Sequence, residues 1–284
     1  MVNRLNLHID ESGSQDFSEG RYIVAVVLHD HSANIADPID RYECRLSIAG
    51  LPNIPFHGKD LLHGNQDYAA VSPGDRKRLL AQFARFVREL PFSFFVLRYG
   101  VSDVRNREEL EARIRRDLAL FVFDRLPYFQ LFDVIAVYYD NGQGAVSIAL
   151  RDALDFALAK NVADYRDADP SARRLLQVAD YICTVIRVSD DYDAGRQTKT
   201  HERFFGNRRS FMQSFKNSLT GSYSTEWHAW NRAPACVMPD DRFPLALYEN
   251  ALGFAENNLS REDLNARPFS RIPICCATST RRDA

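Results

Sequence analysis

Short apolar runs alternate with longer amphipathic segments along residues 1–190, and this order restricts the fold more than any other feature. Runs typical of β-strands lie at 4–9, 22–28, 92–99, 131–139 and 161–167. Segments with helical periodicity lie at 37–48, 73–89, 106–126, 144–160 and 172–188. Because strands that alternate with helices are normally covered by them, the sequence predicts an α/β fold with a sheet flanked by helices.

The remainder of the chain has a different character. Residues 196–220 are basic and aromatic. The pattern at 243–258 predicts a helix, and the tail after about residue 265 lacks any regular pattern. We therefore expect a core at 1–190, an α-rich, helical and basic C-terminal extension at 191–264, and a disordered tail at 265–284.

Charge and cysteine content exclude several classes of protein. The formal net charge is −2, so the whole surface cannot attract nucleic acid, and a polyanion would need a local basic patch. The five cysteines are odd in number and form no CxxC pair, which argues against a zinc knuckle and a secreted disulfide scaffold. The chain shows no basic-then-apolar leader and no apolar run near about 20 residues. We expect a cytoplasmic, prokaryotic protein with no membrane partner.

Three aspartates stand where a carboxylate is costly. Asp10 and Asp140 each end an apolar strand, and Asp180 interrupts an apolar helix. A carboxylate in apolar surroundings needs a partner or a metal ion. Because sites in α/β sheets gather at the ends of strands, the three carboxylates can meet. They predict a site for one or two Mg²⁺ or Mn²⁺ ions.

Each aspartate also has an ordinary structural interpretation. Asp10 and Asp140 precede polar turns, which favour aspartate for local reasons. Asp180 shares a helical stripe with Arg173 and Arg187 and could pair with either, or with a neighbouring segment. These alternatives stay open at the level of sequence. Cys183, three residues after Asp180, is interpreted as a core residue and not as a ligand.

A loop and the basic segment offer further contacts. His57 and Asp60 flank Lys59 in a Pro- and Gly-containing loop, which could reach a metal or a phosphate or could be merely solvated. In 196–216, phenylalanines are interleaved with basic residues, a combination that suits phosphates and unstacked bases. The alternative is a helix that packs its phenylalanines on the core. Our candidates for nucleic-acid contact are Lys59, Gln177, Arg203, Arg208 and Arg209.

Four short motifs carry a resemblance to a known family: Ile9-Asp10-Glu11-Ser12-Gly13, Phe56-His57-Gly58-Lys59-Asp60-Leu61, Tyr139-Asp140-Asn141 and Leu176-Gln177-Val178-Ala179-Asp180-Tyr181. In this order they resemble domain-of-unknown-function family 3800, a prokaryotic family regarded as having a ribonuclease H-like fold. The resemblance covers about residues 4–190. It implies a ribonuclease H-like mixed sheet flanked by helices, with a triad of Asp10, Asp140 and Asp180.

The chain departs from that pattern at one point. Ribonuclease H-like enzymes often add a glutamate from the first helix, whereas the helix at 74–90 offers only Asp75 and Glu89, at its two ends. Glu11, His57 or Asp60 could take this role, so the number of metal ions stays open.

These observations favour a metal-dependent nuclease that hydrolyses phosphodiester bonds of DNA or RNA, with Asp10, Asp140, Asp180 and Glu11 as catalytic residues. Two alternatives keep the same fold: a non-catalytic binder of nucleic acid or nucleotide, and a scaffold for a protein partner. A homodimer is compatible with the sequence.

Overall fold

A mixed sheet of five strands forms the centre of the fold, in the order β3-β2-β1-β4-β5. Its strands are β1 (Arg4–Ser12), β2 (Arg21–Asp30), β3 (Ser93–Gly100), β4 (Val134–Tyr139) and β5 (Val162–Tyr165). The central strand β1 is antiparallel to β2 and parallel to β4. The ends of β1 and β4 therefore point the same way, which is what a shared site at this edge requires.

The computed structural model describes residues 2–13, 20–100, 104–139, 144–158, 162–165 and 170–219. Asp140, the predicted helix at 243–258 and the predicted tail at 265–284 lie outside these ranges. All described residues belong to one compact unit, Met1–Arg232. No helix in the described ranges is long and apolar enough to cross a membrane.

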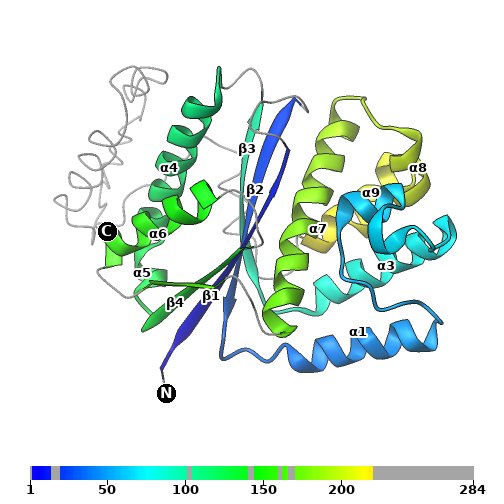
Figure 1. The fold of residues 1–284 in the computed structure, drawn as a ribbon, viewed down its shortest axis with the longest axis horizontal. Coiled ribbons are helices and arrows are strands. Elements are labelled where there is room, and N and C mark those ends of the chain that lie inside the picture. The colour runs from blue at the N-terminus through cyan, green and yellow to red at the C-terminus, as the bar shows by residue number, and fades with distance from the viewer. Residues whose placement is uncertain are drawn as a thin grey trace, which may run out of the picture. The chain divides into compact units, whose positions relative to one another are not determined.

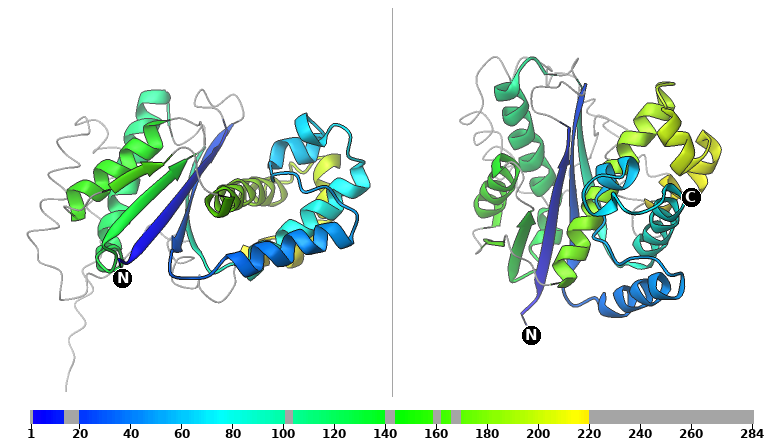
Figure 2. Two further views of the ribbon diagram at one scale, coloured as in Figure 1. Left: turned by 60° about the horizontal axis from the view of Figure 1, so that its bottom comes forward. Right: turned by 45° about the vertical axis from the view of Figure 1, so that its right-hand side comes forward.

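Helices cover both faces of the sheet (Figure 1). One face carries α4 (Arg107–Asp124) and α6 (Gly144–Leu158), with the short α5 (Leu126–Phe129) beside them. The other face carries α7 (Pro170–Asp193), and α1 (Ala36–Ile48) and α3 (Pro73–Glu89) pack beyond it (Figure 2). The shorter elements are α2 (Gly58–His63), α8 (Lys199–Phe205), α9 (Arg208–Ser214) and the 3-10 turns Gln66–Tyr68 and Lys216–Leu219.

Local sequence signals set several of these helix ends. Ser72 caps α3 by accepting a hydrogen bond from the backbone of Asp75, and Pro73 occupies the first turn. Asn106 caps α4 in the same way. Thr198 and His201 form a reciprocal capping box at the start of α8.

Side chains of β1 alternate between an apolar face and a polar face. Leu5, Leu7 and Ile9 are buried apolar residues, whereas Asn6, His8 and Asp10 alternate with them. His8 stacks on Tyr138 with ring centroids 4.8 Å apart, and Tyr138 packs with Leu176 of α7. The polar face of β1 is therefore the face under α7, and Asp10 lies on it.

The α/β prediction is confirmed, with two differences in extent. Helix α7 continues to Asp193, through the expected core boundary at residue 190. The loop expected to contain His57 and Asp60 also contains α2. The phenylalanines of the basic segment are buried in the same hydrophobic cluster as α1, α3 and α7, so the packing alternative holds for them: Phe204, Phe205, Phe211 and Phe215.

Candidate functional site

Asp180 is held by hydrogen bonds from two elements. The backbone N–H of Gly58, at the start of α2, lies 3.1 Å from Oδ2 and 3.3 Å from Oδ1 of Asp180. Thr184, one turn further along α7, donates its hydroxyl to Oδ1 at 3.2 Å. These donors fix the orientation of the carboxylate. The interactions of Asp180 within the described part of the chain are with these donors and with His57 and Asp60, and the side chain of Arg173, the other partner considered from the sequence, lies outside what the structure describes.

The close approach of the backbone at position 58 to Thr184 and Asp180 requires glycine. A Cβ atom there would lie 1.9 Å from Oγ1 of Thr184 and 3.1 Å from Oδ1 of Asp180. A side chain at position 58 would therefore push the loop away from α7 and break the hydrogen bond to the carboxylate.

Gln177 anchors the same loop one turn earlier on α7. Its Oε1 accepts a hydrogen bond from the backbone of Phe56 at 3.1 Å and another from Arg174 at 3.0 Å. Phe56 in turn stacks on Phe83 of α3 at 4.3 Å. The predicted nucleic-acid contact Gln177 thus also positions the loop that reaches Asp180.

Burial is the main influence on the charge of Asp180. It raises the pKa of this carboxyl group, while the charge of His57 and the N–H of Gly58 lower it and the charge of Asp60 raises it. His57 is exposed, and its Nδ1 lies 3.2 Å from Oδ2 of Asp60. His57 and Asp60 therefore lie near enough to Asp180 to influence its charge, and their role as metal ligands stays a prediction.

Asp10 approaches the same region from β1. The thiol of Cys183 donates to the backbone carbonyl of Asp10 at 3.5 Å. Burial raises the pKa of this thiol, and the negative charges of Asp10, Asp180 and Glu11 raise it further. Two of the three predicted aspartates thus lie around one buried thiol. Cys183 itself is a core residue, as expected.

The third aspartate, Asp140, lies outside the described residues. The residue before it, Tyr139, ends β4 and is paired with Ile9, the residue before Asp10. Within the described ranges, no group of three or more His, Cys, Asp and Glu residues is placed to hold a metal ion. The triad that includes Asp140 therefore stays a prediction.

Glu11 turns to the other face of the sheet. It is paired with Val24, and the hydroxyl of Tyr22 donates to its Oε2. Tyr22 also feels the charge of Glu111 on α4, which identifies the face. Burial raises the pKa of Glu11 to about 7, although the hydrogen bond from Tyr22 opposes this rise. Adjacent residues of a strand point to opposite faces, so Glu11 and Asp10 do not face α7 together.

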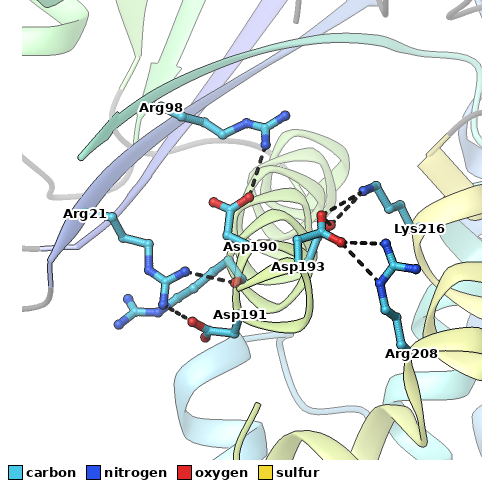
Figure 3. A network of polar contacts seen from close by, with 9 residues as sticks. Arg21, Arg98, Asp190, Asp191, Asp193, Arg208 and Lys216 are labelled. Atoms are coloured by element: carbon cyan, nitrogen blue, oxygen red, sulfur yellow. Dashed lines mark hydrogen bonds and ion pairs between the residues drawn. The ribbon is translucent and has the colours of Figure 1, made fainter. Parts of the chain in front are cut away.

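The predicted basic contacts differ in their surroundings. Lys59, Arg203 and Arg209 are exposed. Arg208 is also exposed, but its Nη2 lies 2.8 Å from a carboxylate oxygen of Asp193 (Figure 3). Lys59 follows Gly58 on α2 and therefore lies near Asp180. The three arginines lie elsewhere: Arg203 is on α8, and Arg208 and Arg209 are on α9.

The chemistry of the site suits a divalent cation. Carboxylate oxygens are the preferred ligands of Mg²⁺ and Mn²⁺. The half-buried Asp180 lies near Asp10, and a cation would offset the desolvation that disfavours its charged form. The sequence interpretation missed the N–H of Gly58, for which a glycine within the motif Phe56–Leu61 was the only signal. Comparisons of the chain with protein-family models and with curated proteins give no match.

Proposed function

We propose that this protein is a metal-dependent nuclease that hydrolyses phosphodiester bonds of DNA or RNA. The observation that carries this proposal is the half-buried carboxylate of Asp180. It lies with Asp10 around the thiol of Cys183 and accepts hydrogen bonds from two neutral donors, the N–H of Gly58 and the hydroxyl of Thr184. A carboxylate in this setting is suited to binding a cation.

The fold adds support to the proposal. The mixed sheet, with β1 at its centre and helices on both faces, is compatible with a ribonuclease H-like fold. The motifs around Asp10, His57, Asp140 and Asp180 would then place the chain near domain-of-unknown-function family 3800. In that arrangement Asp140, which follows Tyr139, would supply the third carboxylate.

The aspartates would bind the cation, and their neighbours would fix the orientation of the Asp180 carboxylate. When bound, Mg²⁺ or Mn²⁺ supplies Lewis-acid chemistry that acidifies water and neutralises charge on phosphate oxygens. Asp10, Asp140 and Asp180 would hold the cation. Gly58 and Thr184 fix the Asp180 carboxylate, so little reorganisation is needed when a ligand binds.

The substitution Asp180→Asn tests the proposal because it keeps the size of the side chain and removes its charge. The variant should lose Mn²⁺- or Mg²⁺-dependent cleavage of labelled DNA and RNA strands. Without metal, its melting temperature should equal or exceed that of the parent, since a desolvated charge has been removed. Mn²⁺ should raise its melting temperature less than it raises the parent's.

Asp152→Asn is the matched control, because Asp152 is an exposed aspartate on α6, across the sheet. It should respond to Mn²⁺ as the parent does. A metal-independent loss of about 3–5 kcal/mol in Asp180→Asn would instead identify Asp180 as a structural partner. Affinity for nucleic acid without metal-dependent cleavage in the parent would favour the non-catalytic binder.

A further inference from the structure

We propose that Arg76 is a positioning residue of the candidate metal site. It holds the C-terminal end of α2 and thereby sets the backbone N–H of Gly58 against the carboxylate of Asp180. The proposal rests on the proposed function, because it takes Asp180 to be a ligand of a divalent cation. It assigns to Arg76 an effect on metal affinity that acts through a neighbouring element and not through contact with the cation.

Arg76 is a buried residue of α3 whose guanidinium lies against the end of α2. Its exposed fraction is 8%. Nη1 donates hydrogen bonds to the backbone carbonyls of Leu61 at 2.7 Å and Leu62 at 3.1 Å. The guanidinium also lies 5.4 Å from the ring centroid of Phe204, on α8. Arg76 therefore joins α3, α2 and α8 at one point.

Arginine at this position has a cost and a specific benefit. Within the described part of the chain, Nε of Arg76 is buried without a hydrogen-bond partner, which costs free energy. An apolar side chain of similar volume would fill the same space without this cost. What arginine adds is a charged donor directed at the last turn of α2, where backbone carbonyls lack partners within the helix.

The fit between Arg76 and α2 leaves little room for movement. The helix ends at Gly64, which adopts a left-handed conformation with a φ of 76°. A Cβ atom on Gly64 would lie 3.0 Å from Cζ and from Nη1 of Arg76. The guanidinium is thus packed against the backbone of this helix end and also bonded to it, so it fixes the place of α2.

The other end of α2 carries the contact with Asp180. Because α2 has six residues, too few for a helix that is stable alone, contacts at its two ends determine where it lies. Leu61 follows Gly58 by three positions, which corresponds to a rise of about 4.5 Å along a helix. Over so short a distance, a displacement of the C-terminal end also moves the N–H of Gly58.

The hydrogen bonds from Gly58 tolerate little displacement. Its backbone nitrogen lies 3.1 Å and 3.3 Å from the two carboxylate oxygens of Asp180. The usual range for such bonds is about 2.7–3.2 Å, so a small outward shift breaks the contact. Loss of a group that orients a ligating side chain typically weakens metal binding by about 10–100-fold. Removal of Arg76 should reach Asp180 by this route.

Arg76→Met tests the positioning, because methionine is also unbranched and removes both the donor and the charge. The electron paramagnetic resonance signal of free Mn²⁺ gives the affinity. The variant should bind Mn²⁺ about tenfold or more weakly than the parent. Its melting temperature in EDTA should stay close to the parent's, because removal of a buried charge and an unpartnered Nε offsets the lost hydrogen bonds.

A second measurement follows Gly58 itself in the metal-free protein. His57–Gly58 and His63–Gly64 are the His–Gly pairs of the sequence, so ¹³C-carbonyl histidine and ¹⁵N-glycine labels select the amides at the two ends of α2. His63→Gln removes the second pair and identifies the signal of Gly58. In EDTA, the Gly58 amide should exchange with solvent about tenfold faster in Arg76→Met than in the parent.

Arg45→Met is the matched control. Arg45 is a partly buried arginine of α1 whose Nε also lacks a partner within the described ranges, but its guanidinium binds Glu89 of α3 and not α2. This variant should keep the parent's Mn²⁺ affinity and Gly58 exchange, even where it lowers the melting temperature. If Arg76→Met does not fold, Arg76→Lys takes its place, because the shorter side chain should also free Gly58 and weaken Mn²⁺ binding.

Three results would overturn the proposal. The first is a variant that matches the parent in both measurements. The second is weaker Mn²⁺ binding with unchanged exchange of Gly58, which identifies an effect of charge alone. The third is faster exchange with unchanged Mn²⁺ affinity, since the contact would then not govern the metal.

The failure of the proposed function has a different signature. In that case the parent binds Mn²⁺ more tightly than Arg76→Met does, and the Gly58 amide responds as expected, but neither DNA nor RNA is cleaved. A parent that binds no Mn²⁺ would overturn both.

Discussion

At the scale of single residues, His8 is a polar side chain buried between the sheet and α7. Its side chain is completely buried against Tyr138, and neither ring nitrogen has a hydrogen-bond partner within the described ranges. Burial holds its pKa well below the ordinary value, and nearby His29 lowers it further. A buried polar group without a partner costs free energy, so His8 is a weak point of the folded state.

Acid should expose this weakness. The unfolded chain takes up a proton at His8 near pH 6.5, whereas the folded chain does not. Below that pH the unfolded state binds more protons, so stability present at neutral pH is lost as the pH falls. His8→Phe keeps a ring against Tyr138 and removes the titration. It should raise the free energy of unfolding by about 1 kcal/mol at pH 7.

Urea unfolding at pH 7 and at pH 5 measures both effects. The variant should lose less stability than the parent between the two values. Some loss should remain, because burial also lowers the pKa of His29. An equal loss in parent and variant would show that His8 is not the group responsible.

At the scale of elements, the last turns of α7 join the sheet to the extension. Asp190 pairs with Arg98 of β3 at 3.1 Å, and Asp193 pairs with Arg208 of α9 at 2.8 Å (Figure 3). Lys216 donates to Ser189 at 2.7 Å. The C-terminal end of α7 therefore contacts both the sheet and the C-terminal extension through charged groups.

This arrangement predicts the effect of Asp193→Asn. If Arg208 guides nucleic acid, loss of its partner should raise the affinity for a labelled strand at low salt. The cost in stability should stay below about 1 kcal/mol, because the pair is largely exposed. Reversing the charge of Arg208 and Arg209 should have the opposite effect on affinity and flatten its salt dependence.

Glu111→Gln is the control for Asp193→Asn, since it removes the partner of Arg107 on α4 and changes the net charge equally. Its affinity should not rise. A rise in both variants would indicate a response to total charge and not to the surface of α9.

Periodicity predicted the elements well, and tertiary contacts explain what it missed. The helix predicted at 172–188 continues to Asp193, and Arg98 and Arg208 bind Asp190 and Asp193 in its last turn. Asp10 and Asp180 could be recognised because a carboxylate among apolar residues is unusual. The donor from Gly58 left only an indirect signal, the glycine itself, because a backbone N–H is present at almost every position of a sequence.

At the scale of the whole molecule, residues 196–219 complete the core. Five of their apolar side chains lie in the cluster formed by α1, α3 and α7: Phe204, Phe205, Phe211, Phe215 and Leu219. Burial of one such side chain contributes about 1.5–3 kcal/mol. The extension is therefore part of the folded unit, although its basic sequence suggested an appendage.

Truncation tests this conclusion. A chain that ends at Asp193 should melt well below the full-length protein or fail to fold, because the cluster loses those side chains. A chain that ends at Arg232, the limit of the compact unit, should retain a cooperative transition. Circular dichroism during heating compares the three proteins. Equal melting of the Asp193 truncation and the full chain would restore the predicted boundary at residue 190.

The central place of β1 has a consequence for synthesis on the ribosome. β1 and β2 emerge before the other strands and can form a hairpin, but β4, the second partner of β1, begins only at Val134. At a synthesis rate of about 5–20 residues per second, the edge of β1 that pairs with β4 stays unpaired for on the order of ten seconds. Polar Asn6, His8 and Asp10 alternate with its apolar residues, and such interruptions discourage pairing between nascent chains. The polar residues of β1, which are costly to bury in the folded protein, thus reduce aggregation of the chain during synthesis.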